Sequence, residues 1–155
     1  MNKHFNFRFV VDAPLARVAE FHRDSQVLPR LTPPPIWVRL HRFDPLADGA
    51  RLEMTMWFGP VPVRWTAVHD AVDPLHGFRD TAEQSPLRFW RHTHRFVELS
   101  PTQAEVHEHV EYDYHPGLRG WLSRVVFSRP GLWFLFVYRS WVTKRMLEGQ
   151  TGARR

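Results

Sequence analysis

The 155-residue sequence contains no cysteine. This absence excludes disulfide bonds, a thiol nucleophile and any zinc or iron–sulfur site that needs thiolate ligands. The start of the chain carries charged side chains and no continuous apolar stretch, so we expect no signal peptide. A chain without disulfides or a leader is expected in the cytoplasm.

Long apolar runs are missing from the sequence as well. In the C-terminal part, the longest stretch without a charged residue covers residues 130–138, which is far shorter than the ~20 residues that a membrane-spanning helix needs. The sequence also lacks a glycine-rich phosphate-binding loop and the motif that presents a hydrolase serine. We therefore expect no transmembrane helix, and nucleotide binding and serine hydrolase chemistry are disfavoured.

Acidic side chains are scarce at the C-terminal end, where the basic charge gathers. Residues 119–155 hold eight of the 21 Lys and Arg residues but only one of the 16 acidic residues, Glu148. The favoured interpretation is a long amphipathic helix with a solvated basic face. Docking of this helix on an anionic membrane or on a partner stays open. Nucleic-acid binding is not expected, because no nucleic-acid motif accompanies the charge.

Hydrophobic periodicity predicts the elements along the chain. Alternating residues predict a first strand, and Asp12 is the expected N-cap of a short helix that follows it. Strand-like alternation then continues from residue 36 to residue 114, interrupted by turns. Helical spacing returns near Leu118, and Pro130 is expected to kink or break the last helix.

This order of elements predicts the fold class. One antiparallel sheet with its helices gathered on one face is an α+β arrangement. We expect a single domain over residues 1–150 and a disordered tail over residues 151–155. A sheet that curls around the terminal helix would enclose a cavity, and such concave apolar spaces are common ligand sites.

Five short segments carry a resemblance to a known superfamily. They are Asp12–Pro14, Leu31–Pro34, Trp90–Phe96, Val110–Tyr112 and Tyr138–Arg139. Together with the order of elements, they resemble the SRPBCC superfamily of START and Bet v 1-like proteins, and within it the bacterial ligand-binding group, over residues 3–148. The resemblance implies the helix-grip fold. In this fold a curved antiparallel sheet of about six or seven strands wraps around a long C-terminal helix, and a short helical segment follows strand 1. Members bind lipids, sterols and polyketides, and some are cyclases or dehydrases.

Three polar residues stand at positions where strand alternation predicts an inward direction. His92 and His94 share one strand face with Trp90, and Glu108 belongs to the apolar face of the next strand. A hairpin register that pairs these faces would bring both imidazoles and the carboxylate together. They could form a hydrogen-bonded polar patch, anchor a ligand, or act as acid and base. No metal is expected, because two histidines at this spacing seldom complete a metal site alone.

We therefore predict a protein that binds a small hydrophobic molecule such as a lipid, a quinone or a polyketide, without a cofactor. The alternatives are a cyclase or dehydrase that uses His92, His94 and Glu108, or a protein that docks through its basic terminal helix. The predicted ligand-binding residues are expected to face the cavity. They are Met54, Met56, Phe58, Trp65, Trp90, His92, His94, Glu108, Val110, Tyr112 and Tyr138.

Overall fold

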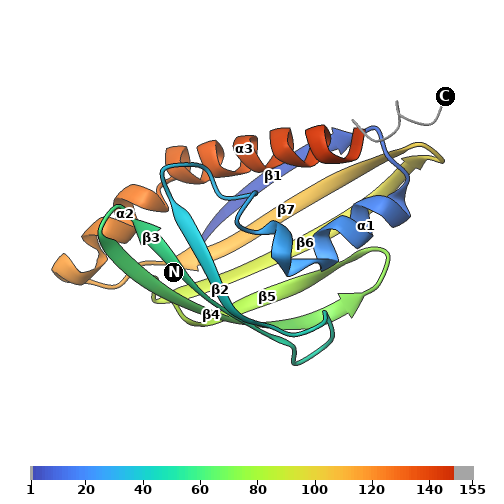
Figure 1. Ribbon diagram of the computed structural model, residues 1–155. Helices are drawn as coiled ribbons and strands as arrows, with labels where there is room; N and C mark the ends of the chain where they lie inside the picture. The colour runs from blue at the N-terminus through green and yellow to red at the C-terminus, as the bar shows by residue number, and fades with distance from the viewer. Residues whose placement is uncertain (1, 149–155) are drawn as a thin grey trace.

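The computed structural model describes residues 2–148 as a curved antiparallel sheet with its helices on the concave side (Figure 1). The sheet has seven strands in the order β1-β7-β6-β5-β4-β3-β2. The strands are β1 (Lys3–Val11), β2 (Trp37–Phe43), β3 (Arg51–Phe58), β4 (Val61–Asp73), β5 (Gly77–Gln84), β6 (Phe89–Ser100) and β7 (Gln103–Asp113). Strands β2 to β7 form a meander, and β1 pairs with β7.

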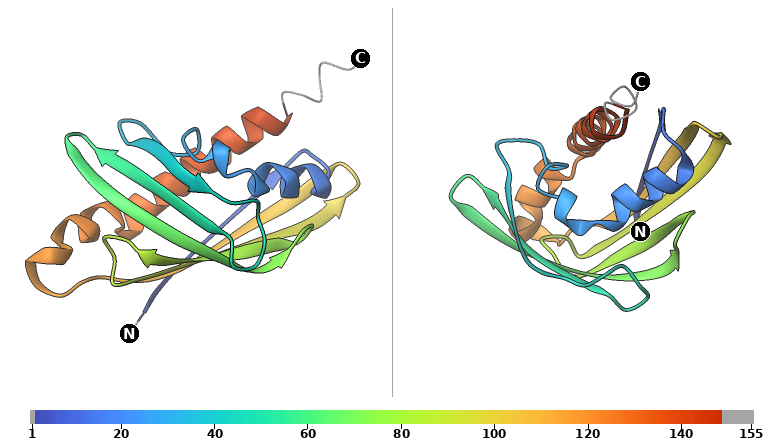
Figure 2. Two further views of the ribbon diagram at one scale, coloured as in Figure 1. Left: turned by 60° about the horizontal axis from the view of Figure 1, so that its bottom comes forward. Right: turned by 45° about the vertical axis from the view of Figure 1, so that its right-hand side comes forward.

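The helical segments lie before and after this meander. They are α1 (Leu15–Arg23), the 3₁₀ turns η1 (Ser25–Val27) and η2 (Gly117–Gly120), α2 (Trp121–Val126) and α3 (Arg129–Glu148). Figure 2 shows α3 along the open side of the curved sheet. The predicted fold class, a curved sheet wrapped around a long terminal helix, is confirmed. The tail predicted over 151–155 lies outside the described residues.

The two helix boundaries that were predicted from single residues have different outcomes. The break near Pro130 is confirmed, because α2 ends at Val126 and α3 begins at Arg129. Asp12 is not the N-cap of α1, since that helix begins only at Leu15, after Pro14. Asp12 instead joins the ends of two other elements. Its carboxylate accepts a hydrogen bond from Gln103 at 2.7 Å, and its backbone N–H donates to Glu148 at 3.0 Å.

Two apolar clusters fill the ends of the concave space. One gathers Val11, Val18, Phe96 and Val106 beneath α1. The other gathers residues of the sheet against α2 and α3, and its members include Phe5, Trp65, Trp90, Tyr112, Phe127, Leu132 and Phe136. Burial of these large side chains is the main stabilising contribution to the fold. Between the clusters the space is not completely filled.

Candidate functional site

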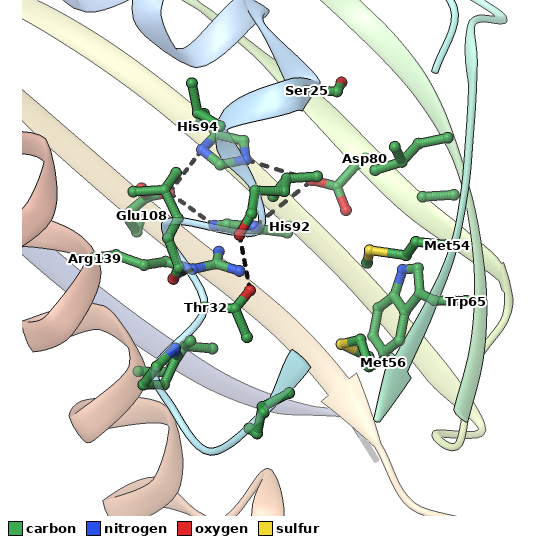
Figure 3. A pocket seen from close by; sticks show the side chains of 18 of the residues that line it. Ser25, Thr32, Met54, Met56, Trp65, Asp80, His92, His94, Glu108 and Arg139 are labelled. Atoms are coloured by element: carbon green, nitrogen blue, oxygen red, sulfur yellow. Dashed lines mark hydrogen bonds and ion pairs between the residues drawn. The ribbon is translucent and has the colours of Figure 1, made fainter. Parts of the chain in front are cut away.

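A cavity of about 320 Å³ lies between the concave face of the sheet, the segment that follows α1, and helices α2 and α3. One wall is largely apolar and comes from β3 and β4, and Met54, Met56 and Trp65 are among its side chains (Figure 3). The opposite part carries charged and polar side chains. This size and this distribution of apolar and polar groups are typical of a site for a small organic molecule.

Four titratable side chains of the cavity wall lie in contact with one another: Asp80 from β5, His92 and His94 from β6, and Glu108 from β7. We call them the Asp-His-His-Glu cluster. Glu108 Oε2 lies 2.7 Å from His92 Nε2 and 2.9 Å from His94 Nδ1. Asp80 Oδ2 lies 3.4 Å from His94 Nε2 and 3.6 Å from His92 Nδ1. Each carboxylate therefore faces both imidazoles, as Figure 3 shows.

Strand pairing places these side chains together. His94 is directly opposite Glu108 in the β6–β7 register, and Asp80 is opposite His92 in the β5–β6 register. Gly77 allows the second pairing, because it adopts a positive φ of 136° and a Cβ there would lie 2.0 Å from the carbonyl oxygen of His94. Any larger residue at position 77 would push the two strands apart at the cluster.

Opposite charges within the Asp-His-His-Glu cluster stabilise the ionised forms of its buried side chains. Burial alone would lower the pKa of His94, but Glu108 and Asp80 outweigh it and raise the pKa to about 9. Burial would raise the pKa of Glu108, yet His94 and His92 hold it well below its usual range. The pKa of His92 is lowered, chiefly by burial. At neutral pH the cluster therefore holds two carboxylates, a cationic His94 and a neutral His92.

Arg139 adds a second positive charge to the cavity wall. Its Nε donates to the carbonyl oxygen of Leu31 at 3.3 Å, and its guanidinium lies 5.5 Å from the ring centre of Phe136. Burial lowers the pKa of Arg139, while the charges of Glu108 and Asp80 act in the opposite direction. Within residues 2–148, no carboxylate forms a salt bridge with this guanidinium. It is a cation that faces the cavity, and among the described residues the carbonyl of Leu31 is its only hydrogen-bond partner.

Eight of the eleven predicted ligand-binding residues lie around the cavity. They are Met54, Met56, Phe58, Trp65, Trp90, His92, His94 and Glu108. The structure does not place Val110, Tyr112 and Tyr138 there. Val110 and Tyr112 share the inward strand face but are completely buried inside the apolar cluster that also contains Phe5, Phe127 and Phe136. Tyr138 points away because it stands two residues after the inward Phe136 on a helix, and its ring lies 6.1 Å from that of Trp141.

Sequence reasoning missed several polar residues of the cavity wall, among them Asp80, Arg139 and His22. The signals for two of them are present in the sequence. Asp80 alternates with Phe78 and Ala82 on β5, so it belongs to an apolar strand face. Arg139 follows Phe136 by three residues, which places it on the inward face of α3. An ionisable residue on an otherwise apolar face was the indication in both cases.

No protein-family model matches the sequence, and a search of curated proteins finds no match. Solved structures do match nearly the whole chain. An aromatase/cyclase from a Streptomyces species has a TM-score of 0.69 at 15% identity, covering 94% of this chain and 96% of that chain. A Thalictrum flavum norcoclaurine synthase mutant with a transition-state analogue has a TM-score of 0.72 at 14% identity, covering 97% of each chain. A Chromobacterium violaceum protein has a TM-score of 0.76 at 14% identity, covering 94% of this chain and 97% of that chain.

These matches show that the chain has the Bet v 1-like helix-grip fold. This is the fold that the predicted resemblance to the SRPBCC superfamily implies, and membership of that superfamily stays a prediction. Placement in its bacterial ligand-binding group stays a prediction. No helix within residues 2–148 is long and apolar enough to cross a membrane.

The shifted pKa values predict that the free energy of unfolding falls on both sides of neutral pH. Because the pKa of His94 is raised from 6.5 to about 9, its protonation contributes on the order of 3 kcal/mol to the free energy of unfolding. This contribution is complete below pH 6.5 and is lost as the pH rises through 9. In acid, two effects favour unfolding. Burial lowers the pKa of His22 to about 4, so this side chain takes up a proton more readily in the unfolded chain. Protonation of Asp80 and Glu108 also removes their stabilising charges. Urea unfolding across this pH range, with a chelator present, measures both losses.

The alkaline loss has a direct control in His94→Gln, which removes the group that titrates. This variant should be less stable at pH 7 and should show a flatter stability profile between neutral pH and pH 9. A profile as steep as that of the unaltered chain would mean that another group causes the alkaline loss.

Proposed function

We propose that the protein binds a small hydrophobic molecule that carries a polar group at one end, such as a lipid, a quinone or a polyketide-like compound. The observation that carries this proposal is the cavity of about 320 Å³, with an apolar wall on one side and a charged cluster on the other. Burial of the apolar part of the ligand supplies most of the binding free energy, and the polar end sets its orientation.

The lining residues support this division of roles. Met54 and Met56 are flexible and polarisable, so they can adapt to an irregular apolar ligand. At the other end, Arg139 offers N–H donors to an oxygen atom of the ligand. An oxygen-bearing group at that end would accept a hydrogen bond from the guanidinium, whereas a purely apolar molecule would leave it with the Leu31 carbonyl alone among the described residues.

A cavity-filling substitution tests the proposal. A fluorescent fatty-acid probe should bind the unaltered chain and be displaced by ligand. Met56→Trp adds a large ring to the apolar wall, and we expect it to weaken probe binding at least tenfold, which is about 1.4 kcal/mol. Met56→Leu conserves volume and should bind nearly as well as the unaltered chain. Absence of probe binding to the unaltered chain, or equal affinities for both variants, would contradict the proposal.

A second candidate is an enzyme of the cyclase or dehydrase type. The observation that favours it is the position of His92, His94 and Glu108, whose imidazoles and carboxylate line the cavity within contact distance of one another. Such groups can exchange protons with a bound substrate. For this candidate, His94→Ala must abolish turnover of a polyketide substrate while the variant still binds it. Retained turnover would remove the candidate.

Docking on an anionic membrane is a separate candidate, and it rests on the outer face of α3. The sequence predicted a solvated basic face, but the structure exposes large aromatic side chains there: Trp133, Phe134 and Trp141 are 58%, 56% and 54% exposed. Lys144 and Arg145 share this helix. Exposed tryptophan beside Lys and Arg is the composition of surfaces that lie at the lipid–water interface. Phe134 also lines the cavity, so such a membrane would contact a residue of the cavity wall.

Vesicle binding tests this docking surface. The chain should sediment with vesicles that contain phosphatidylserine more than with phosphatidylcholine alone, and less at high salt, because salt screens the attraction to basic side chains. We expect the double substitution Trp133→Ser and Trp141→Ser to weaken binding at least about tenfold. Trp37→Ser is the control, since Trp37 is 70% exposed on the edge strand β2. Equal loss in both variants would argue against docking through α3.

A further inference from the structure

We propose that Asp80, His92 and His94 form a binding site for a divalent transition-metal ion of the zinc type, with Glu108 as the carboxylate that orients both imidazoles. The sequence-based expectation of no metal weighed the two histidines of β6 together with Glu108 of β7, and it included no ligand from another strand. Strand β5 supplies such a ligand. The site adjoins the cavity, but metal binding does not depend on the hydrophobic ligand proposed above.

The distances between the three donor atoms fit a coordinated ion better than they fit hydrogen bonds. One donor atom each from Asp80, His92 and His94 lie within 4.8 Å of one another. Asp80 Oδ2 is 3.4 Å from His94 Nε2 and 3.6 Å from His92 Nδ1, which is long for hydrogen bonds. A tetrahedral ion with ligand bonds of about 2.1 Å separates neighbouring ligand atoms by about 3.4 Å. The two Asp80–histidine distances match this separation, and all three atoms lie within 4.8 Å of one another, so they can surround one ion.

Glu108 lies where metal sites commonly have a carboxylate that contacts the histidine ligands without binding the metal. A histidine that binds a metal through one nitrogen almost always donates its other N–H to a carboxylate, a carbonyl or water. Here the nitrogens that face away from Asp80 are His92 Nε2, which is hydrogen-bonded to Glu108 Oε2 at 2.7 Å, and His94 Nδ1, which lies 2.9 Å from the same oxygen without a hydrogen bond. This arrangement directs His92 Nδ1 and His94 Nε2 to the ion.

Charge and proton balance are consistent with a doubly charged cation. Metal binding requires a neutral imidazole, so the ion would displace the proton from His94 into solvent. The charges of Asp80 and Glu108 then balance the cation, and Arg139 remains as a single positive charge on the cavity wall. Two nitrogens and one carboxylate oxygen suit zinc, cobalt or nickel rather than magnesium or calcium, which prefer all-oxygen sites.

The cavity leaves room for a fourth ligand. All four cluster residues line it, although their side chains are at most 15% exposed. A site with three protein ligands and an open position toward a cavity is the arrangement in which a metal binds water or a substrate oxygen. An oxygen at the polar end of a bound molecule could occupy that position.

Titration of the chelator-treated protein with Co²⁺ tests the site through the absorption bands of the bound ion and through calorimetry. We expect one ion per chain, with affinity reduced at least about tenfold by Asp80→Asn and by Glu108→Gln. The control is the double variant His107→Gln and His109→Gln, which removes the other His-x-His pair, on the opposite face of β7, and should leave the affinity unchanged. No binding by the folded chain, or binding lost only in the control variant, overturns the proposal.

A second readout keeps the test decisive if a cluster variant fails to fold. In the unaltered chain, paramagnetic Co²⁺ should shift the imidazole resonances of His92 and His94 and leave those of His107 and His109 in place. Shifts confined to the second pair, or no shifts, overturn the metal site. Probe binding by the metal-free chain is measured in parallel, so failure of the metal site and failure of hydrophobic ligand binding give different results.

Discussion

Replacing Glu108 with glutamine is expected to lower the free energy of unfolding by about 3–5 kcal/mol at neutral pH, because it removes one partner of a buried ion pair. The Glu108 carboxylate contacts both imidazoles of the cluster and is only 5% exposed. Without its charge, the cationic form of His94 loses its strongest stabilising neighbour, and the pKa of His94 should fall from about 9. Urea unfolding measures the first effect, and an NMR titration of the His94 ring measures the second.

Glu105→Gln is the matched control on the same strand. Glu105 also contacts a histidine, with 2.5 Å between its Oε2 and His107 Nε2, but these two side chains are 27% and 22% exposed on the outer face of β7. Solvent weakens such a pair, so we expect a loss below about 1 kcal/mol. If both substitutions cost the same small amount, the cluster would not be held together by buried charges.

The sequence predicted the fold well because most of its signals are local. The alternation in residues 51–58, for example, is set by which side chains of β3 face the cavity, and the structure has this strand over Arg51–Phe58. The ends of elements depend on contacts with distant segments. Asp12 has the chemistry of an N-cap, yet Gln103 and Glu148 already occupy its polar groups. Those partners lie far along the chain and cannot be found from local sequence.

For the candidate site, too, local sequence patterns predicted some features, and others depend on contacts between distant segments. Alternation was enough to place His92, His94 and Glu108 on inward faces, but the register that puts His94 opposite Glu108 depends on an irregularity in the β6–β7 hairpin between Glu98 and Ser100. Asp80 joins them only through the pairing of β5 with β6. Tyr112 shows the reverse case, because its strand face is inward as predicted but the side chain is buried in the apolar cluster that joins the sheet to α2 and α3. Facing direction follows from local pattern, whereas access to the cavity follows from how the helix packs.

The aromatic side chains of α3 allow a comparison between two phenylalanines one half-turn apart. Phe136 is 0% exposed, and its ring lies 5.5 Å from that of Phe5 and 5.3 Å from that of His92. Phe136→Ala should therefore leave a cavity between the helix and the sheet and cost about 3–5 kcal/mol of unfolding free energy. For a chain of this length, thermal melting should show a loss of roughly 6–20 °C.

Phe134→Ala removes the same side chain from the outer face, where Phe134 is 56% exposed. This variant should melt within about 2 °C of the unaltered chain, since exposed substitutions usually change stability by no more than about 0.5 kcal/mol. Its binding to vesicles that contain phosphatidylserine should nevertheless weaken if α3 docks on a membrane. A large loss of stability in Phe134→Ala would show that the outer aromatic side chains support the fold. In that case their exposure would no longer favour an interaction surface.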